Sequence, residues 1–424
     1  MRIPFLAELE CPFCGSPLAI ADHPARVDDG RELHTGVLGC ECCAYPVVDG
    51  IPVIRADDSA RELLAALDAR QVDRARARLL GLDGDRLARF TALEAAPTSS
   101  FMDFVPVLGD AGEGTYFAFR FSDPTFVVSE ALVSALVAMP GALGRGAIDV
   151  GGGAGHLTRR LAAASAAAGA PAPILADYHP WKLWLARRFV VPSAESVCID
   201  ANVPLPFAAA ARSFACCSDA FHYIWSRRLL AGEMRRVTGD DGVVLVTHMH
   251  NMFVYNPSAG MPLSPRAYAH LAAPLQGRLF GDDTLRRGIL ESVAVDLGAR
   301  PTTDDLVSES SLTLVAARDA AVFTTHALGA VAMPGEWRLN PLYRVSSDDT
   351  HAVLTLEFPS SDYDDEFGAC RAYLPQRLEL PAAAIAHPAE LAASRADLVA
   401  RRVLVNVPFR YLPPDDWTSP RGER

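Results

Sequence analysis

Three glycines stand at alternate positions after an acidic residue, in the segment Asp149-x-Gly151-x-Gly153-x-Gly155. Glycines let the backbone turn sharply and come close to a bound nucleotide, because no side chain intervenes. The segment is not a dinucleotide fingerprint, since His156 stands where the third glycine of that motif belongs, and it lacks the lysine of a P-loop. An acid at the head of the loop disfavours a phosphate and favours a ligand with a positively charged end.

Acidic residues also end the two apolar runs that follow, at Asp177 and Asp200. An acid at such a position can accept hydrogen bonds from both hydroxyls of a ribose, which we expect of Asp177. We expect Tyr178 to lie against an adenine ring, and Asp200 to accept a hydrogen bond from the adenine amino group beside the Ala201 backbone. S-adenosylmethionine has these parts, with an ammonium, a sulfonium and no phosphate, and is the predicted cofactor. Its predicted contacts are Asp149, Gly151, Gly153, Gly155, Asp177, Tyr178, Asp200, Ala201 and Ser218.

Three histidines follow the fourth and fifth apolar runs of this region. His248 and His250 are two residues apart, which would place both on one side of an extended segment. A histidine with a pKa near ~6.5 can remove a proton from a hydroxyl or a protonated amine at neutral pH. We therefore predict His250, His248 and His222 as candidate general bases. The alternatives are ordinary hydrogen-bonding histidines, or a metal site on His248 and His250, for which no convincing third ligand is visible nearby.

The segment 251–283 separates the fifth apolar run from the next predicted helix and contains several prolines and aromatic residues. Insertions of this kind commonly cover a substrate pocket, and a plain surface loop is the alternative. We predict substrate contacts in this insertion and in the loop after Ser218, at Asp219, Tyr223, Tyr255, Met261 and Tyr268.

Five of the nine cysteines lie in the first 43 residues. The frame Cys11-x2-Cys14 … Cys40-x2-Cys43 supplies four thiolates in two pairs, which matches a tetrahedral structural zinc site with no open position. Cys42 competes with Cys43 as the fourth ligand, and the two-residue spacing favours Cys43. Free thiols in a reducing cytosol are the alternative.

The elements that must position these residues follow from the hydrophobic pattern. The glycines lie between an apolar run at 147–150 and a helical pattern at 156–164, which indicates a strand, a turn and a helix. Four further apolar runs alternate with helical patterns, at 174–177, 197–200, 213–218 and 242–247. We predict an α/β fold with a doubly wound, Rossmann-like sheet, whose ligand site lies at the carboxyl ends of the strands.

Two parts of the chain resemble known families. The first 55 or so residues, with CPFCG at 11–15 and YPVVDGIPVI at 45–54, resemble the zinc ribbon of the activator subunit of tRNA and release-factor methyltransferases. Residues 147–315 resemble class I S-adenosylmethionine-dependent methyltransferases of the small-molecule type, through the glycine loop, the acids at 177 and 200, Leu205-Pro206-Phe207 and the run 233–246. Gly152 and His156 depart from that family's pattern. The resemblance implies methyl transfer and S-adenosylmethionine as the cofactor.

We predict four regions along the chain. They are a zinc ribbon at 1–57, a helical linker and cofactor-covering segment at 58–140, a methyltransferase domain at 141–318 with a substrate lid at 251–283, and a β-rich domain at 319–424. The aromatic run 116–121 either closes over the ligand or belongs to a core. The role of the C-terminal region is left open between substrate binding, a dimer interface and the covering of a sheet edge.

Charge and hydropathy narrow the range of possible partners and locations of the protein. The net charge of -12 disfavours a nucleic-acid or anionic-membrane partner. The N-terminus lacks the apolar core of a signal peptide and no apolar run reaches ~18 residues, so we expect a cytoplasmic protein. The predicted function is methyl transfer to an oxygen or nitrogen (or carbon) of a small molecule, in secondary metabolism, the biosynthesis of natural products. The alternatives are a protein or RNA substrate, or a scaffold that recruits a partner through the zinc ribbon; a homodimer is left open.

Overall fold

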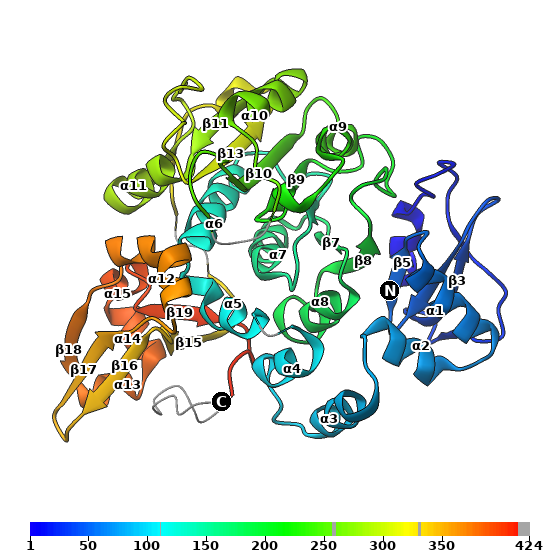
Figure 1. Cartoon of the computed structure of the whole chain (residues 1–424), viewed down its shortest axis with the longest axis horizontal. Helices are drawn as coiled ribbons and strands as arrows, with labels where there is room; N and C mark the ends of the chain where they lie inside the picture. Colours follow the sequence, from blue (N-terminus) through cyan, green and yellow to red (C-terminus); the bar gives the residue numbers. More distant parts are fainter. Residues whose placement is uncertain (111, 257–259, 330–331, 414–424) are drawn as a thin grey trace. The chain divides into compact units, whose positions relative to one another are not determined.

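The computed structural model describes residues 1–110, 112–256, 260–329 and 332–413 (Figure 1). The chain divides into two compact units. Unit 1 consists of Met1–Leu87, Val128–Tyr255 and Ala259–Val331, and unit 2 of Ala88–Val127, Asn256–Ser258 and Ala332–Arg424. Within the described ranges, no helix is long and apolar enough to cross a membrane.

A twelve-stranded sheet runs through the described part of unit 1. Seven of its strands have the order β8-β7-β6-β9-β10-β13-β11, and they are parallel except for β13, which is antiparallel to both neighbours. The order reverses between β6 and β9, as in a doubly wound sheet, so the predicted fold class is confirmed. The strands are β6 (Ala147–Val150), β7 (Ile174–Asp177), β8 (Glu195–Ile199), β9 (Phe214–Ser218), β10 (Val243–His250), β11 (Gly277–Gly281) and β13 (Ser311–Ala316).

Helices cover both faces of this sheet, which explains why every residue of β6 is buried. Ala147 belongs to a core cluster with residues of α6, α7 and α11, whereas Ile148 and Val150 belong to a second cluster with α9 and α10. Glycines in the left-handed region begin and end α7, at Gly155 and Gly169. The helices are α6 (Pro124–Val137), α7 (His156–Ala168), α8 (Pro180–Leu185), α9 (Arg227–Thr238), α10 (Pro265–Ala272) and α11 (Asp282–Ser292).

The N-terminal strands continue this sheet. β3 (Leu33–Gly39), β4 (Ala44–Val48) and β5 (Ile51–Ile54) pair antiparallel, and β5 then pairs parallel with β8, with Val53 opposite Cys198. Figure 1 shows β5 beside β8. The short strands β1 (Ala19–Ile20) and β2 (Val27–Asp28) both pair with β3. The cysteine-bearing segment is therefore joined by backbone hydrogen bonds to the sheet that carries the glycine turn.

The structure bears on two of the predicted segments. The insertion 251–283 is not a lid throughout, because its second part forms α10 and then β11, a strand of the central sheet. The aromatic run 116–121 packs inside unit 2, where Phe117 lies edge-on to Phe101 and Phe101 stacks on Tyr411. These aromatic rings belong to a core, which is one of the two alternatives that the sequence left open.

The helices of the linker region are α1 (Asp58–Asp68), α2 (Val72–Leu79), α3 (Gly84–Ala95), α4 (Phe101–Leu108) and α5 (Glu113–Phe119). Unit 2 also contains the strands β15 (Glu336–Leu339), β16 (Tyr343–Ser347), β17 (His351–Leu356), β18 (Arg377–Pro381) and β19 (Leu404–Val407), in two small antiparallel sheets. Its other helices are α12 (Ser361–Phe367), α13 (Ala382–Ile385), α14 (Pro388–Ser394) and α15 (Ala396–Ala400). The antiparallel pair β12 (Ala294–Asp296) and β14 (Thr325–Ala327) belongs to unit 1.

Candidate functional site

The glycine turn between β6 and α7 adopts backbone conformations that suit glycine. Gly151, Gly153 and Gly155 have φ angles of 71°, 57° and 83°. A Cβ atom at Gly155 would lie 2.7 Å from Val191 Cγ1, so no side chain fits there. The Gly151 N–H donates to the Ala176 carbonyl at 2.7 Å, and this bond holds the start of the turn against β7.

Asp149 lies beneath the turn rather than at its surface. Its side chain is fully buried, and its carboxylate accepts a hydrogen bond of 2.6 Å from the Thr158 hydroxyl of α7. A Cβ atom at Gly152 would lie 2.6 Å from the same carboxylate, so the turn packs directly on Asp149. The structure therefore gives Asp149 a supporting position for the turn, whereas the sequence predicts a direct contact with the cofactor.

Asp177, at the end of β7, reaches the turn from the neighbouring strand. Its carboxylate accepts hydrogen bonds from the Gly153 and His179 N–H groups, both at 2.8 Å. Tyr178 is 46% exposed, and the guanidinium of Arg55 lies 3.7 Å from the centre of its ring. Arg55 also donates to the Tyr178 carbonyl at 2.8 Å and pairs with Asp57.

Arg55 is a residue of this region that sequence reasoning missed. It directly follows the apolar run of β5, and that position at the end of an apolar run was the only available signal.

Asp200 follows β8 at the same edge of the sheet. Its carboxylate accepts two hydrogen bonds of 2.9 Å from Asn202, one from the backbone and one from the side chain. Asp200 is half-buried, and Ala201 is buried beside it. The predicted adenine contacts thus lie at the end of the strand next to β7, with their carboxylate already oriented by Asn202.

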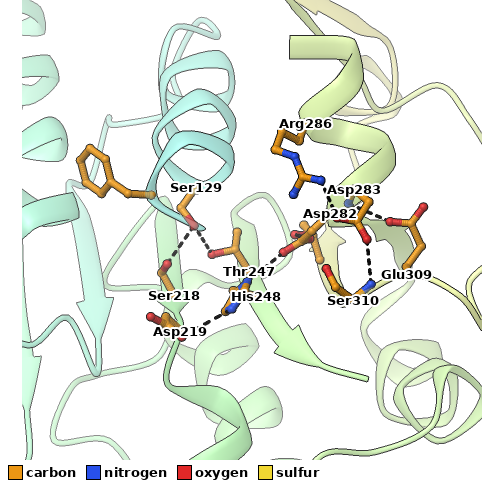
Figure 2. A network of polar contacts seen from close by, with 12 residues as sticks. Ser129, Ser218, Asp219, Thr247, His248, Asp282, Asp283, Arg286, Glu309 and Ser310 are labelled. Atoms are coloured by element: carbon orange, nitrogen blue, oxygen red, sulfur yellow. Dashed lines mark hydrogen bonds and ion pairs between the residues drawn. The ribbon is translucent and has the colours of Figure 1, made fainter. Parts of the chain in front are cut away.

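Ser218, the last residue of β9, belongs to a hydroxyl chain (Figure 2). Its hydroxyl donates to that of Ser129 at 2.9 Å, and Ser129 is 2.8 Å from the Thr247 hydroxyl. All three side chains are buried. Ser129, which lies on α6, was not predicted, and its chain ties that helix to the ends of β9 and β10.

His248 lies between two carboxylates, as Figure 2 shows. Its Nε2 is 3.9 Å from Asp219 Oδ1, and its Nδ1 is 3.4 Å from Asp282 Oδ2. Asp219 and His248 have φ angles of 57° and 54°, in the left-handed region that non-glycine residues rarely adopt. The register of β10 against β13 shifts between Val246 and Met249. The predicted regular extended segment is therefore interrupted by an irregularity at His248.

His222 and His250 stack on each other, with ring centres 3.7 Å apart and an angle of 18° between the planes. Burial, which disfavours the charged form, lowers the pKa of His222 to about 4 and that of His250 to about 3. Both rings are therefore neutral and only weakly basic at neutral pH, and the role of general base stays a prediction for these two residues. Among the three predicted histidines, His248 has a partly exposed side chain, at 18%.

The predicted substrate residues separate into two groups. Tyr223 and Tyr255 are 47% and 83% exposed, in the loops after β9 and β10, while Asp219 and Met261 are partly exposed. Tyr268 is 1% exposed, and its hydroxyl donates to the His250 carbonyl at 3.1 Å. The prediction of a substrate contact for Tyr268 is not supported, because this side chain belongs to the core that ties α10 to β10.

The N-terminal sulfur atoms form a compact group made of Cys11, Cys14, Cys40 and Cys42, whose Sγ atoms all lie within 4.8 Å of one another. Cys42 thus takes the place that the two-residue spacing assigns to Cys43. The N–H groups of both Cys42 and Cys43 point at the Cys40 sulfur, at 3.4 and 3.3 Å, and the Cys43 sulfur lies 3.4 Å from that of Cys42, just outside the group. Four thiolates at these distances fit a zinc ion.

Cys11 is the buried member of the sulfur group. Burial alone would raise the pKa of its thiol, but hydrogen bonds from the Tyr45 hydroxyl and from the backbone of Phe13 and Cys14 lower it to about 6. A thiol that ionises this readily suits a metal ligand, since the thiolate is the binding form.

Among known proteins, the chain is similar to several solved structures. No family model and no curated protein matches the chain. Similar structures include a complex that contains the Haloferax volcanii Trm112 methyltransferase activator, at 16% identity over 48% of this chain and 95% of that chain, with a TM-score of 0.34. A SAM-dependent methyltransferase from Thermotoga maritima matches at 12% identity over 51% and 96% of the chains, with a TM-score of 0.32.

Phosphoethanolamine N-methyltransferase 2 of Haemonchus contortus, in complex with S-adenosyl-L-methionine, matches at 15% identity over 52% of this chain and 60% of that chain, with a TM-score of 0.36. The function proposed below rests on the residues of the site and not on this similarity.

Proposed function

We propose that the protein transfers a methyl group from S-adenosylmethionine to an oxygen or nitrogen atom of a small molecule. The observation that carries this proposal is the 2.8 Å hydrogen bond from the Gly153 N–H to the Asp177 carboxylate. It joins the glycine turn to an acid-ended strand beside the point where the strand order reverses, between β6 and β9. A doubly wound sheet binds its ligand at that point.

The residues present fit this cofactor. Among the atoms of the described residues, only Lys182 Cδ would lie within 4 Å of a Cβ atom at Gly153, at 3.9 Å, so the turn leaves room for a ligand against its backbone. Asp177 and Asp200 end adjacent strands, and a pair of carboxylates suits ribose hydroxyls and an amino group better than a pyrophosphate. In this proposal the glycine turn holds the methionyl part, Asp177 the ribose, and Tyr178 and Asp200 the adenine.

When bound, this cofactor supplies a methyl group on a sulfonium, an electrophile that needs a nucleophile aligned with it. The chain's own residues would position the acceptor beside the ends of β9 and β10. Ala220, which follows Asp219, would be 2.7 Å from a Cβ atom at Gly151, so the loop after β9 packs against the glycine turn. Asp219 and His248 are therefore the polar residues that we assign to the acceptor's side of the site.

The surroundings of this site favour an acceptor with an apolar part. Large apolar side chains are exposed in the loops after β9 and β10, and apolar groups with a few polar ones are typical of small-molecule sites. They are Tyr223, Trp225, Met252, Phe253 and Tyr255. We further propose that a structural zinc ion binds the four sulfur atoms of Cys11, Cys14, Cys40 and Cys42.

Calorimetry with S-adenosylhomocysteine tests the proposed cofactor site. We expect the wild-type protein to bind one molecule per chain, and Asp177→Ala to weaken binding by about tenfold or more, since hydrogen bonds to a charged group contribute ~1.5–3 kcal/mol. Asp304→Ala, at an exposed loop position, is the control and should bind as the wild type does. Absence of binding by the wild type, or equal binding by Asp177→Ala, would contradict the proposal.

A further inference from the structure

Three side chains of types that commonly bind metal ions lie close together, and one of them is Asp219 of the proposed acceptor site. Asp219 follows β9, His222 lies in the short helix Phe221–Tyr223, and His250 ends β10. One carboxylate oxygen and one nitrogen from each ring all lie within 4.8 Å of one another. Ligands of a tetrahedral ion with bonds of about 2.0–2.1 Å are about 3.3 Å apart, so small side-chain rotations would complete such a site.

The burial of His222 requires an explanation. Its side chain is fully buried, and neither ring nitrogen makes a hydrogen bond of normal length and angle with another described residue, although the backbone of His248 lies close enough to act on the ring. A buried polar group without a partner is costly, and such groups are rare in folded proteins. Its neighbour His250 is 3% exposed, so water does not reach the pair freely. A cation bound at the edge of the stacked rings, next to Asp219, would satisfy one nitrogen atom of each ring.

The surrounding residues support the same conclusion. His248 lies 3.9 Å from Asp219 and can orient its carboxylate, as residues behind a metal ligand commonly do. Asp219 and His248 also share an uncommon left-handed backbone conformation, and such residues concentrate at functional sites.

The backbone at Gly260 and Met261 packs against His222. The Met261 N–H donates to the His222 carbonyl at 2.9 Å, and a Cβ atom at Gly260 would lie 2.7 Å from His222 Cδ2. Only glycine fits at this distance, so the backbone of the segment lies directly on the ring. His222 is therefore packed against Gly260, while Ala220, which follows Asp219, packs against the glycine turn.

We propose that Asp219, His222 and His250 bind a divalent first-row metal ion, such as Co²⁺, Zn²⁺ or Mn²⁺, that also binds the methyl acceptor. Two imidazoles and one carboxylate leave coordination positions open, as in catalytic rather than structural metal sites. In this part of the chain the sequence offered His248 and His250 as an alternative metal site and showed no convincing third ligand.

The role of the ion rests on the proposed function. It adds that the methyl acceptor is a hydroxyl compound. A hydroxyl oxygen bound to the ion has a lowered pKa and releases its proton to water. A lone pair of that oxygen then forms the new bond to the methyl carbon while the carbon–sulfur bond breaks. The sulfur keeps the bonding pair, so the products are the methyl ether and neutral S-adenosylhomocysteine, with one proton released.

Titration with Co²⁺ alone, by calorimetry on protein already loaded with zinc, tests the site. Thiolates hold zinc tightly, so the zinc-loaded sulfur group should not take up Co²⁺. We expect one further Co²⁺ per chain in the wild type, and a loss of at least about 100-fold in affinity in His222→Ala and in Asp219→Asn. His270→Ala, at an exposed position on α10, should bind Co²⁺ as the wild type does.

Asp219→Asn keeps the size of a partly exposed side chain, so it tests the site even if His222→Ala does not fold. Absence of Co²⁺ binding in the wild type, or unchanged binding in Asp219→Asn, would overturn the metal site. S-adenosylhomocysteine binding, measured on the same samples, reports on the cofactor site separately. Co²⁺ binding without S-adenosylhomocysteine binding would keep the metal site and refute the proposed function.

Discussion

The guanidinium of Arg55 lies 3.7 Å above the ring of Tyr178 and donates to its carbonyl at 2.8 Å. Arg55 follows β5, the last strand of the cysteine-bearing segment, and Tyr178 follows β7, the strand that ends in Asp177. Arg55 is buried and forms an ion pair with Asp57, so the N-terminal segment fixes the position of its side chain. The N-terminal segment therefore contributes directly to the shape of the proposed cofactor site.

Arg55→Ala should weaken cofactor binding without disrupting the sheet. The substitution removes a charged hydrogen bond, typically ~1.5–3 kcal/mol, and a cation–π contact of ~0.5–2 kcal/mol, part of which holds Tyr178 in place. We expect the dissociation constant of S-adenosylhomocysteine, measured by calorimetry, to rise by about tenfold. Arg61→Ala, which breaks an exposed pair with Asp58 on α1, is the matched control and should leave binding unchanged. Equal affinities of Arg55→Ala and wild type would show that Tyr178 needs no support from β5.

Cys42→Ser and Cys43→Ser distinguish the two candidates for the fourth zinc ligand. Only Cys42 belongs to the compact sulfur group, so Cys42→Ser should lower the zinc content of purified protein well below one ion per chain, whereas Cys43→Ser should keep it near one. The melting temperature of Cys42→Ser should fall as well, since metal binding contributes folding free energy. Elemental analysis measures the zinc. The opposite pattern would restore Cys43 as the ligand, and no zinc in the wild type would end the proposal of a structural metal.

Gly153→Ala should reduce cofactor binding much more than stability. Gly153 and Gly169 have similar left-handed φ angles of 57° and 62°, so alanine at either position should cost about 1 kcal/mol of folding free energy. A Cβ atom at Gly169, at the far end of α7, would have no atom of the residues that the structure describes within 4 Å. A Cβ atom at Gly153 would instead enter the proposed ligand space. Denaturant unfolding should give similar losses for both variants, and calorimetry should show weakened S-adenosylhomocysteine binding for Gly153→Ala alone. Unchanged binding in Gly153→Ala would place the ligand elsewhere.

The sequence by itself determined the features that depend on neighbouring residues. The run 147–150 and the run 174–177 are strands with the predicted limits, and the glycines between 150 and 156 form the predicted turn. Alternating apolar patterns and left-handed glycines are properties of a few consecutive residues, so they can be read without a structure. For the same reason the paired cysteines indicated a metal site, and the acids at strand ends indicated where a ligand would bind.

Only the tertiary structure decided the features that depend on residues far apart in the chain. The pairing of Val53 with Cys198 joins the N-terminal strands to the sheet, and nothing local to either strand encodes it. The burial of Tyr268 and the stacking of His222 on His250 depend on which elements cover the ends of β9 and β10. Because the pKa of a histidine and the exposure of a tyrosine are set by that covering, the sequence could name candidate residues, while only the packing of the fold could assign their roles.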